Sequence, residues 1–153
     1  MIKFCVEQWD NNKEKLEKYF EEMSKDELLE LGYIDLVKAI VKCIFNNNEK
    51  YSWDSERITE IDNGYYQGTL LYLIPEDRYQ PDEAEYLMTY VGYGSCSGCD
   101  TLLSIKAWFN DKDEIIKDYI SLCKDIVQNT IKPYNAGWRQ DDIFNTVDIK
   151  EIE

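Results

Sequence analysis

The sequence predicts an α+β fold in which an antiparallel β-meander packs with helices on one face. Apolar residues recur at intervals of three and four in the first 50 residues and again after residue 100, which is typical of helices. Between residues 57 and 93 the pattern becomes strand-like and contains Asn63-Gly64, a strong hairpin signal. A length of 153 residues, 44% of them hydrophobic, fits one globular domain spanning residues 1–153. We expect about three to five strands and about four or five helices.

The first residues predict a short strand followed by three helices. Ile2, Phe4 and Val6 alternate with more polar residues, which indicates a half-buried strand. Residues 10–12, Asp-Asn-Asn, offer N-cap oxygens for a first helix. The apolar face of that helix is Leu16, Tyr19, Phe20 and Met23.

A capping-box pair, Ser24 with Glu27, opens a second short helix that we expect Gly32 to end. A third helix follows, and residues 46–48, Asn-Asn-Asn, end it. Its apolar stripe is Leu36, Val37, Ile40, Val41 and Ile44.

The middle of the chain predicts the meander. Residues 57–62 form a first strand, residues 65–74 return from the Asn63-Gly64 turn, and Pro75 breaks the second strand. Residues 76–85 form an acidic loop, and residues 86–93, rich in aromatic and β-branched residues, form a third strand.

Two further helices are predicted after this strand. Asp100 caps a short helix containing Leu102, Leu103 and Ile105, and Asp111 with Glu114 resembles a second capping box. The long helix that follows stops before Pro133, and a last edge strand is expected at Val147 and Ile149. The buried face of the long helix is predicted to be Ile115, Ile116, Tyr119, Ile120, Cys123, Ile126 and Val127.

The composition excludes several classes of function. The chain has no histidine, so histidine general bases, Ser-His or Cys-His nucleophile pairs and histidine-containing zinc sites are excluded. No apolar run reaches the roughly 18 residues that a membrane span needs, and the N-terminus lacks a secretory pattern. Five cysteines without such a pattern predict reduced thiols and a cytoplasmic protein.

Net charge points to the kind of partner. The chain carries −14, and residues 51–100 supply −8 of it. A field of this sign repels nucleic-acid phosphates and anionic membranes, so we expect neither as a direct partner. Basic protein surfaces are the expected partners, and the oligomeric state is left open.

The acidic residues of this middle third are the candidate partner-binding surface. One interpretation is a patch that imitates nucleic-acid phosphates and blocks a basic groove, with interleaved tyrosines as anchors. The other is a solvated face that keeps the protein soluble. The candidates are Asp54, Glu56, Glu60, Asp62, Glu76, Asp77, Asp82, Glu83 and Glu85.

The CxxC at Cys96 and Cys99 is the alternative site, and three interpretations of it stay open. Two cysteines at this spacing suit a metal such as zinc, although the remaining ligands are not evident. They also suit a thiol–disulfide pair between a strand and a helix, which the neighbouring charge of Asp100 opposes. The small residues around them, including Gly94 and Gly98, are also typical of a tight packing turn.

Catalysis would have to rest on paired carboxylates. Such pairs, which could act as acid and base or bind Mg²⁺, occur in turn-like polar context. They are Asp54 with Glu56, Asp82 with Glu83, and Asp141 with Asp142. The aromatic turn at residues 134–139 is expected to cover the core. We therefore favour a non-enzymatic protein without a cofactor.

The run from Tyr90 to Leu102, YVGYGSCSGCDTL, resembles a segment of small uncharacterised proteins encoded by bacteriophages and their hosts. The resemblance implies a small acidic protein that acts in the host cytoplasm. It favours an inhibitor that binds a basic nucleic-acid-handling host protein, including defence enzymes that target DNA. The alternatives are a CxxC-based metal or redox protein and a structural module of a larger assembly.

Overall fold

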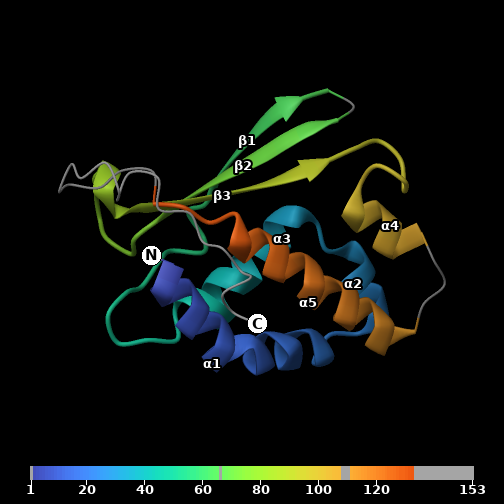
Figure 1. Ribbon diagram of the computed structural model, residues 1–153, viewed down its shortest axis with the longest axis horizontal. Helices are drawn as coiled ribbons and strands as arrows, with labels where there is room; N and C mark the ends of the chain where they lie inside the picture. The colour runs from blue at the N-terminus through green and yellow to red at the C-terminus, as the bar shows by residue number, and fades with distance from the viewer. Residues whose placement is uncertain (1, 66, 108–110, 133–153) are drawn as a thin grey trace.

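The computed structural model describes residues 2–65, 67–107 and 111–132, and Figure 1 shows their arrangement. Five α-helices and three strands lie within this part of the chain. Two shorter helical segments accompany them: η1, a π-type continuation of α3, and η2, a single 3₁₀ turn. In chain order the elements are α1 (Ile2–Glu21), α2 (Lys25–Glu30), α3 (Tyr33–Ile40), η1 (Val41–Phe45), β1 (Thr59–Gly64), β2 (Gly68–Pro75), η2 (Glu83–Glu85), β3 (Tyr86–Tyr93), α4 (Thr101–Ala107) and α5 (Lys112–Gln128).

The three strands form an antiparallel meander in the order β1-β2-β3. Ile61 lies opposite Leu71, and Leu71 lies opposite Tyr90. Figure 1 shows the helices gathered on one side of this sheet, with α3 and α5 nearer to it and α1 farther away. The predicted α+β meander with helices on one face is therefore confirmed.

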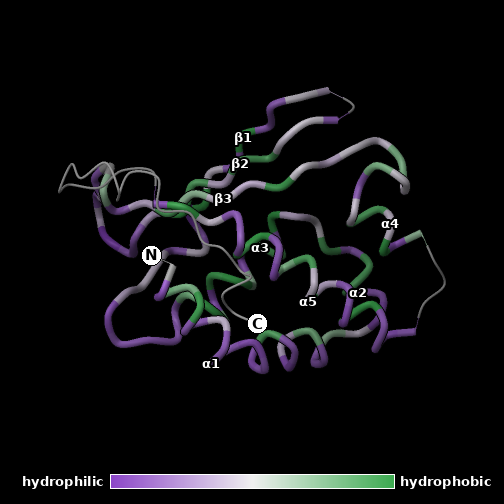
Figure 2. The backbone as a smooth tube through the Cα atoms, viewed as in Figure 1, coloured by the Kyte–Doolittle hydropathy of each residue, from purple (hydrophilic) through white to green (hydrophobic). Residues whose placement is uncertain are grey.

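The core lies between the sheet and the helices. Tyr72, Ile74 and Leu87 close it from the sheet side, and Leu36, Ile40 and Tyr119 are among its fully buried helical members. In Figure 2, α3 is hydrophobic, whereas the outer α1 carries long hydrophilic stretches. This arrangement is expected because α3 is covered on more sides than α1.

The predicted strand at the N-terminus is wrong, because α1 begins at Ile2. The buried positions of this segment are Cys5, Gln8, Trp9 and Asn12, at helical spacing. Asn12 is not part of an N-cap. It is buried within the helix, where its amide donates to Gln8 Oε1 at 3.1 Å and to the Ile44 carbonyl at 3.2 Å. The alternation of Ile2, Phe4 and Val6 misled because the residues that pack inward include polar ones.

The hairpin is confirmed, but its turn lies later than predicted. Asn63 pairs with Thr69 inside the sheet, and the last pair is Gly64 with Gly68. The two glycines face each other so closely that a Cβ on Gly64 would lie 2.8 Å from the Cα of Gly68. The strands can therefore continue to this pair before the chain turns.

Two predicted helix starts are confirmed, whereas the predicted end of α2 is wrong. The Ser24–Glu27 capping box is present, and Asp111 caps α5 through the backbone N–H of Glu114. Gly32 does not end α2, whose C-cap is Leu31, but is the N-cap residue of α3. On α5, Leu122 is buried, whereas Ile120 is only partly buried. The predicted strand at residues 147–149 and the turn at 134–139 lie outside the described residues.

No helix in residues 2–65, 67–107 and 111–132 has the length and apolar character of a membrane span.

Candidate functional site

The loop from Gly94 to Asp100 joins the end of β3 to the start of α4 and borders two hollows of the surface. One hollow lies between α4 and α5. The other lies between the sheet, the start of α3 and α4. Because the loop carries the CxxC and contributes to both hollows, it is the centre of the candidate site.

Asp100 holds this loop in place. The residue is only 6% exposed. Its Oδ1 accepts hydrogen bonds from the Tyr33 hydroxyl at 2.7 Å and the Leu103 N–H at 3.0 Å. Its Oδ2 accepts from the Gly94 N–H at 2.9 Å. One carboxylate therefore caps α4, as predicted, and also ties it to β3 and α3.

Tyr33 extends this network. Its hydroxyl donates to Asp100 and accepts from the Leu102 N–H at 3.1 Å. Burial raises the pKa of Tyr33 above its usual range, and the Asp100 carboxylate adds to the increase. The hydroxyl thus stays protonated at neutral pH and acts as a fixed donor to Asp100.

Cys96 and Cys99 form a close pair at the exposed tip of the loop. Their side chains meet sulfur to sulfur, with Cα atoms 5.4 Å apart. The Cys99 N–H donates to the Cys96 carbonyl at 3.1 Å, which closes a tight turn. A Cβ added to Gly94 would lie 2.6 Å from the Cys99 sulfur, whereas one added to Gly98 would meet nothing within 4 Å. Close packing therefore requires Gly94 but not Gly98.

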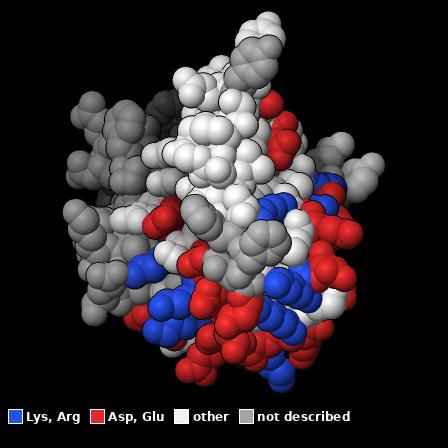
Figure 3. Space-filling model, turned by 90° about the vertical axis from the view of Figure 1, so that its right-hand side faces the viewer, with Lys and Arg blue, Asp and Glu red and all other residues white. Residues whose placement is uncertain are grey.

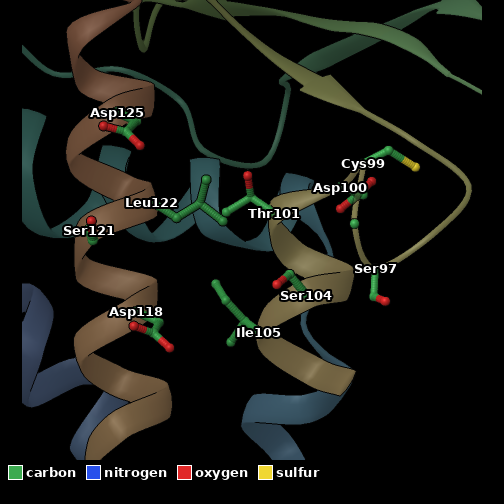
Figure 4. Close-up of a pocket in the computed structure, with 11 residues that line it drawn as sticks. Ser97, Cys99, Asp100, Thr101, Ser104, Ile105, Asp118, Ser121, Leu122 and Asp125 are labelled. Atoms are coloured by element: carbon green, nitrogen blue, oxygen red, sulfur yellow. The ribbon is translucent and has the colours of Figure 1, made fainter. Parts of the chain in front are cut away.

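The first hollow, which we call the α4–α5 cleft, is polar. Its volume is about 530 Å³, and Figure 4 shows its walls. Asp118 and Asp125 lie on the α5 side and Thr101 and Ser104 on the α4 side, while the Cys99 sulfur points away from the space between the helices. Burial raises the pKa of Asp125. The lining residues are Ser97, Gly98, Cys99, Asp100, Thr101, Ser104, Ile105, Asp118, Ser121, Leu122 and Asp125.

The second hollow, which we call the Tyr33–Tyr93 pocket, is more apolar and has a volume of about 350 Å³. Its walls include the Leu70, Leu102 and Leu103 side chains. At its rim, the Tyr93 hydroxyl donates to Asp62 Oδ1 at 2.5 Å. The lining residues are Gly32, Tyr33, Asp62, Leu70, Tyr93, Gly94, Asp100, Leu102 and Leu103.

Within the described part of the chain, four of the nine predicted acidic residues are paired with nearby cations. Arg57 Nε lies 2.6 Å from Asp54, and Lys42 Nζ lies 3.5 Å from Glu56. Arg78 Nε lies 3.3 Å from Glu76 and 2.5 Å from Glu85. The side chains of Glu76 and Glu85 are only 17% and 20% exposed, and burial raises the pKa of Glu76. Glu76 and Glu85 therefore hold the 76–85 loop together through Arg78 as well as carrying charge.

The other predicted acidic residues are dispersed. Glu60 and Asp62 lie on the exposed strand β1, and Asp77 is exposed in the loop. Asp82 caps η2 through the Ala84 N–H, and the Glu83 side chain lies outside the described part of the structure. The structure therefore places Asp62 in a pocket and spreads the other described members along the loop and β1.

Charge is also dense on the helices. In the face seen in Figure 3, acidic and basic side chains crowd the helical half, whereas the half over the sheet is largely uncharged. The end of α1, α2 and the start of α5 lie at this end of the molecule in Figure 1. Exposed carboxylates on these segments are Glu21, Glu22, Asp26, Glu27, Glu30, Asp113 and Glu114.

Sequence reasoning missed Tyr33, Asp118, Ser121 and Asp125. The three α5 residues are spaced by three and four, so the amphipathic pattern places them on one helical stripe. Nothing local indicates that this stripe faces α4. The hydrogen bond from Tyr33 to Asp100 spans 67 residues and leaves no signal in the sequence between them.

The remaining cysteines lie on α1, η1 and α5. Cys5 and Cys123 are buried, and Cys43 is partly buried. No group of three or more cysteine, aspartate or glutamate side chains within the described residues is arranged to hold a metal ion.

Comparisons with protein-family models, with curated proteins and with solved structures find no match to this chain.

Proposed function

We propose that this protein is a non-enzymatic, acidic binding protein whose partner is a basic protein surface. The observation that carries the proposal is the charge of the two hollows beside the Gly94–Asp100 loop. All described charged residues that line them are aspartates: Asp62 and Asp100 in the pocket, and Asp100, Asp118 and Asp125 in the cleft. Among the described residues, no lysine or arginine lines either hollow.

Such hollows favour cationic groups over anionic ones. Asp118 and Asp125 can accept hydrogen bonds from ammonium or guanidinium groups, and the hydroxyls of Thr101 and Ser104 can complete their coordination. The net charge of −14 adds a long-range field that speeds encounter with a basic partner and repels nucleic acid.

The natural partner in this proposal is a nucleic-acid-handling protein of the host cytoplasm, because such proteins carry basic surfaces shaped for phosphates. The resemblance of residues 90–102 to phage-type proteins supports a role as an inhibitor of that partner. Inhibition then follows from occupation of the basic groove by carboxylates.

Binding of a fluorescent deca-arginine peptide to the full chain tests the proposal, with deca-glutamate and a double-stranded oligonucleotide as comparisons. Of these three probes, we expect only deca-arginine to show saturable binding. Affinity should fall steeply between low and high salt because the Debye length shrinks from about 10 Å at 0.1 M to about 3 Å at 1 M. Absence of deca-arginine binding at low salt, or comparable binding of the oligonucleotide, would refute it.

A pair of charge-matched variants locates the binding surface. The first combines Asp62→Asn, Asp118→Asn and Asp125→Asn, which line the hollows. The second combines Asp10→Asn, Glu14→Gln and Glu17→Gln, which are exposed on α1. Both remove three charges, so a larger loss in the first shows that the hollows bind. Substitution of Glu76 and Glu85 is a poorer test because both hold Arg78.

The close pair of Cys96 and Cys99 favours a second candidate function, thiol–disulfide exchange. Both residues are exposed, and their sulfurs meet at the loop tip. Equilibration in glutathione buffers, followed by mass spectrometry, should show a reversible loss of two hydrogens from this pair. If the pair stays reduced across the glutathione series, thiol–disulfide exchange is refuted. A loss of stability in the variant carrying Cys96→Ser and Cys99→Ser would then identify the CxxC as a packing turn.

A further inference from the structure

We infer that the Tyr33–Tyr93 pocket receives a single arginine side chain of the partner, with Asp62 as the residue that binds its guanidinium group. The inference rests on the proposed function and names the anchor of that interaction. It is carried by the combination in one pocket of apolar walls, two tyrosines and a carboxylate at the rim.

The pocket is suited in size to one long side chain. Its volume of about 350 Å³ is at the small end of ligand sites. Leu70, Leu102 and Leu103 supply apolar contact along its walls, and Leu103 is 40% exposed. An arginine side chain has an apolar stem that can bury against leucines while its charged end stays near solvent.

The two carboxylates of the pocket differ in how many hydrogen bonds they can still accept from a ligand. Asp100 is buried and already accepts three hydrogen bonds, from Tyr33, Gly94 and Leu103. Asp62 is exposed, and its Oδ1 accepts the Tyr93 hydroxyl, which orients the carboxylate. Among the described residues, none forms a hydrogen bond or an ion pair with Asp62 Oδ2. Asp62 is therefore the carboxylate placed to accept a cation.

The chemistry of the walls selects the occupant. An anionic ligand would be repelled by Asp62, and a wholly apolar one would desolvate that carboxylate without replacing its hydrogen bonds. Lysine satisfies the charge, but a planar guanidinium can also donate two hydrogen bonds and lie against a tyrosine ring. Arginine therefore matches the pocket best.

A titration of the full chain, labelled with ¹⁵N, with Nα-acetyl-arginine amide tests this inference. We expect saturable shifts confined to the amides around the pocket, chiefly Tyr93, Gly94, Leu102 and Leu103. The norleucine analogue, which lacks the guanidinium group, should bind about tenfold more weakly because a charge-assisted contact is lost. Shifts spread evenly over the surface, or equal binding of the two probes, would overturn the inference.

Asp62→Asn and Asp10→Asn form a matched pair, because each removes one exposed carboxylate but only Asp62 lines the pocket. We expect Asp62→Asn to weaken arginine amide binding about tenfold and Asp10→Asn to change it less than about twofold. A second variant, Leu103→Lys, places a competing cation at the pocket and should abolish binding of the probe. Equal effects of Asp62→Asn and Asp10→Asn would overturn the inference.

The deca-arginine assay separates this inference from the proposed function. If deca-arginine binds the native chain and the Asp62→Asn variant equally well, the acidic binding function stands and the pocket is not its anchor. If the arginine amide binds at the pocket but deca-arginine does not bind the chain, the pocket assignment stands and the wider function fails.

Discussion

Among the residues of the candidate site, Asp100 is the one whose replacement we expect to lower the free energy of unfolding most. In Asp100→Asn, the amide oxygen can replace Oδ1 and keep the contacts from Tyr33 and Leu103. The amide nitrogen then faces the Gly94 N–H, which donates to Oδ2 at 2.9 Å in the native protein. Two donors oppose each other, and a buried N–H loses its acceptor.

The size of the effect follows from these contacts. A hydrogen bond to a charged group contributes about 1.5–3 kcal/mol, so we expect Asp100→Asn to lower the free energy of unfolding by about 2–3 kcal/mol. Asp100→Ala removes all three contacts and should cost more, about 4 kcal/mol or above. Tyr33→Phe removes one donor to Asp100 and the acceptor of the Leu102 N–H, and should cost about 1–2 kcal/mol.

Urea denaturation followed by tryptophan fluorescence and far-ultraviolet circular dichroism measures these differences. For a chain of this size, about 2–3 kcal/mol corresponds to a fall in Tm of about 4–12 °C. The double variant of Tyr33→Phe with Asp100→Asn should show coupling, because the two side chains share a hydrogen bond. An Asp100→Asn variant within about 0.5 kcal/mol of the native protein, or strict additivity in the double variant, would refute the reasoning.

Three further predictions test other parts of the structure. Gly94→Ala should lower the free energy of unfolding, measured by a thermal melt, by about 1–3 kcal/mol because the new Cβ would collide with Cys99. Gly98→Ala should change it by less than about 0.5 kcal/mol. Equal effects of the two substitutions would contradict this account of the loop. Burial raises the pKa of Cys5 to about 12 and also raises the pKa of Cys123, so a thiol reagent at pH 8 should modify them only slowly. After reduction, the exposed Cys96 and Cys99 should react much faster in the same titration, and rapid modification of Cys5 or Cys123 in the folded protein would contradict the described packing. The hydrogen bond from Arg57 lowers the pKa of Asp54. The contribution of the Asp54–Arg57 pair to stability is therefore present above the unfolded-state pKa of about 3.9 and is lost as the pH falls through the lower folded pKa. Asp54→Asn should have a lower Tm than the native protein at pH 6 but a similar Tm at pH 2, and a Tm difference that is the same at both pH values would contradict this account.

Much of the fold could be predicted because its signals are local. The capping box at Ser24, the stripe from Leu36 to Ile44 and the strand from Tyr86 to Tyr93 each depend on residues close together in sequence. The N-terminal strand failed for a related reason. Its alternation is local too, but burial of Gln8 and Asn12 depends on α1 packing beside η1, where Asn12 donates to the Ile44 carbonyl.

The candidate site depended far more on tertiary structure. The Gly94–Asp100 loop stands out in the sequence, but its pocket needs Tyr33 and Asp62 from distant elements. The acidic middle third likewise stands out by charge alone. Only the folded chain shows that Arg78 lies against Glu76 and Glu85, or that Asp118 and Asp125 face α4.

The lack of histidine, the net charge of −14 and the alternation of helical and strand-like segments are all readable in the sequence. These properties follow from composition and from periodicities a few residues long. By contrast, which carboxylates are paired with cations and which line a hollow depends on the folded chain. That division depends on the packing of segments far apart in the chain, because side-chain contacts across 67 residues are set by the assembled core rather than by neighbouring sequence.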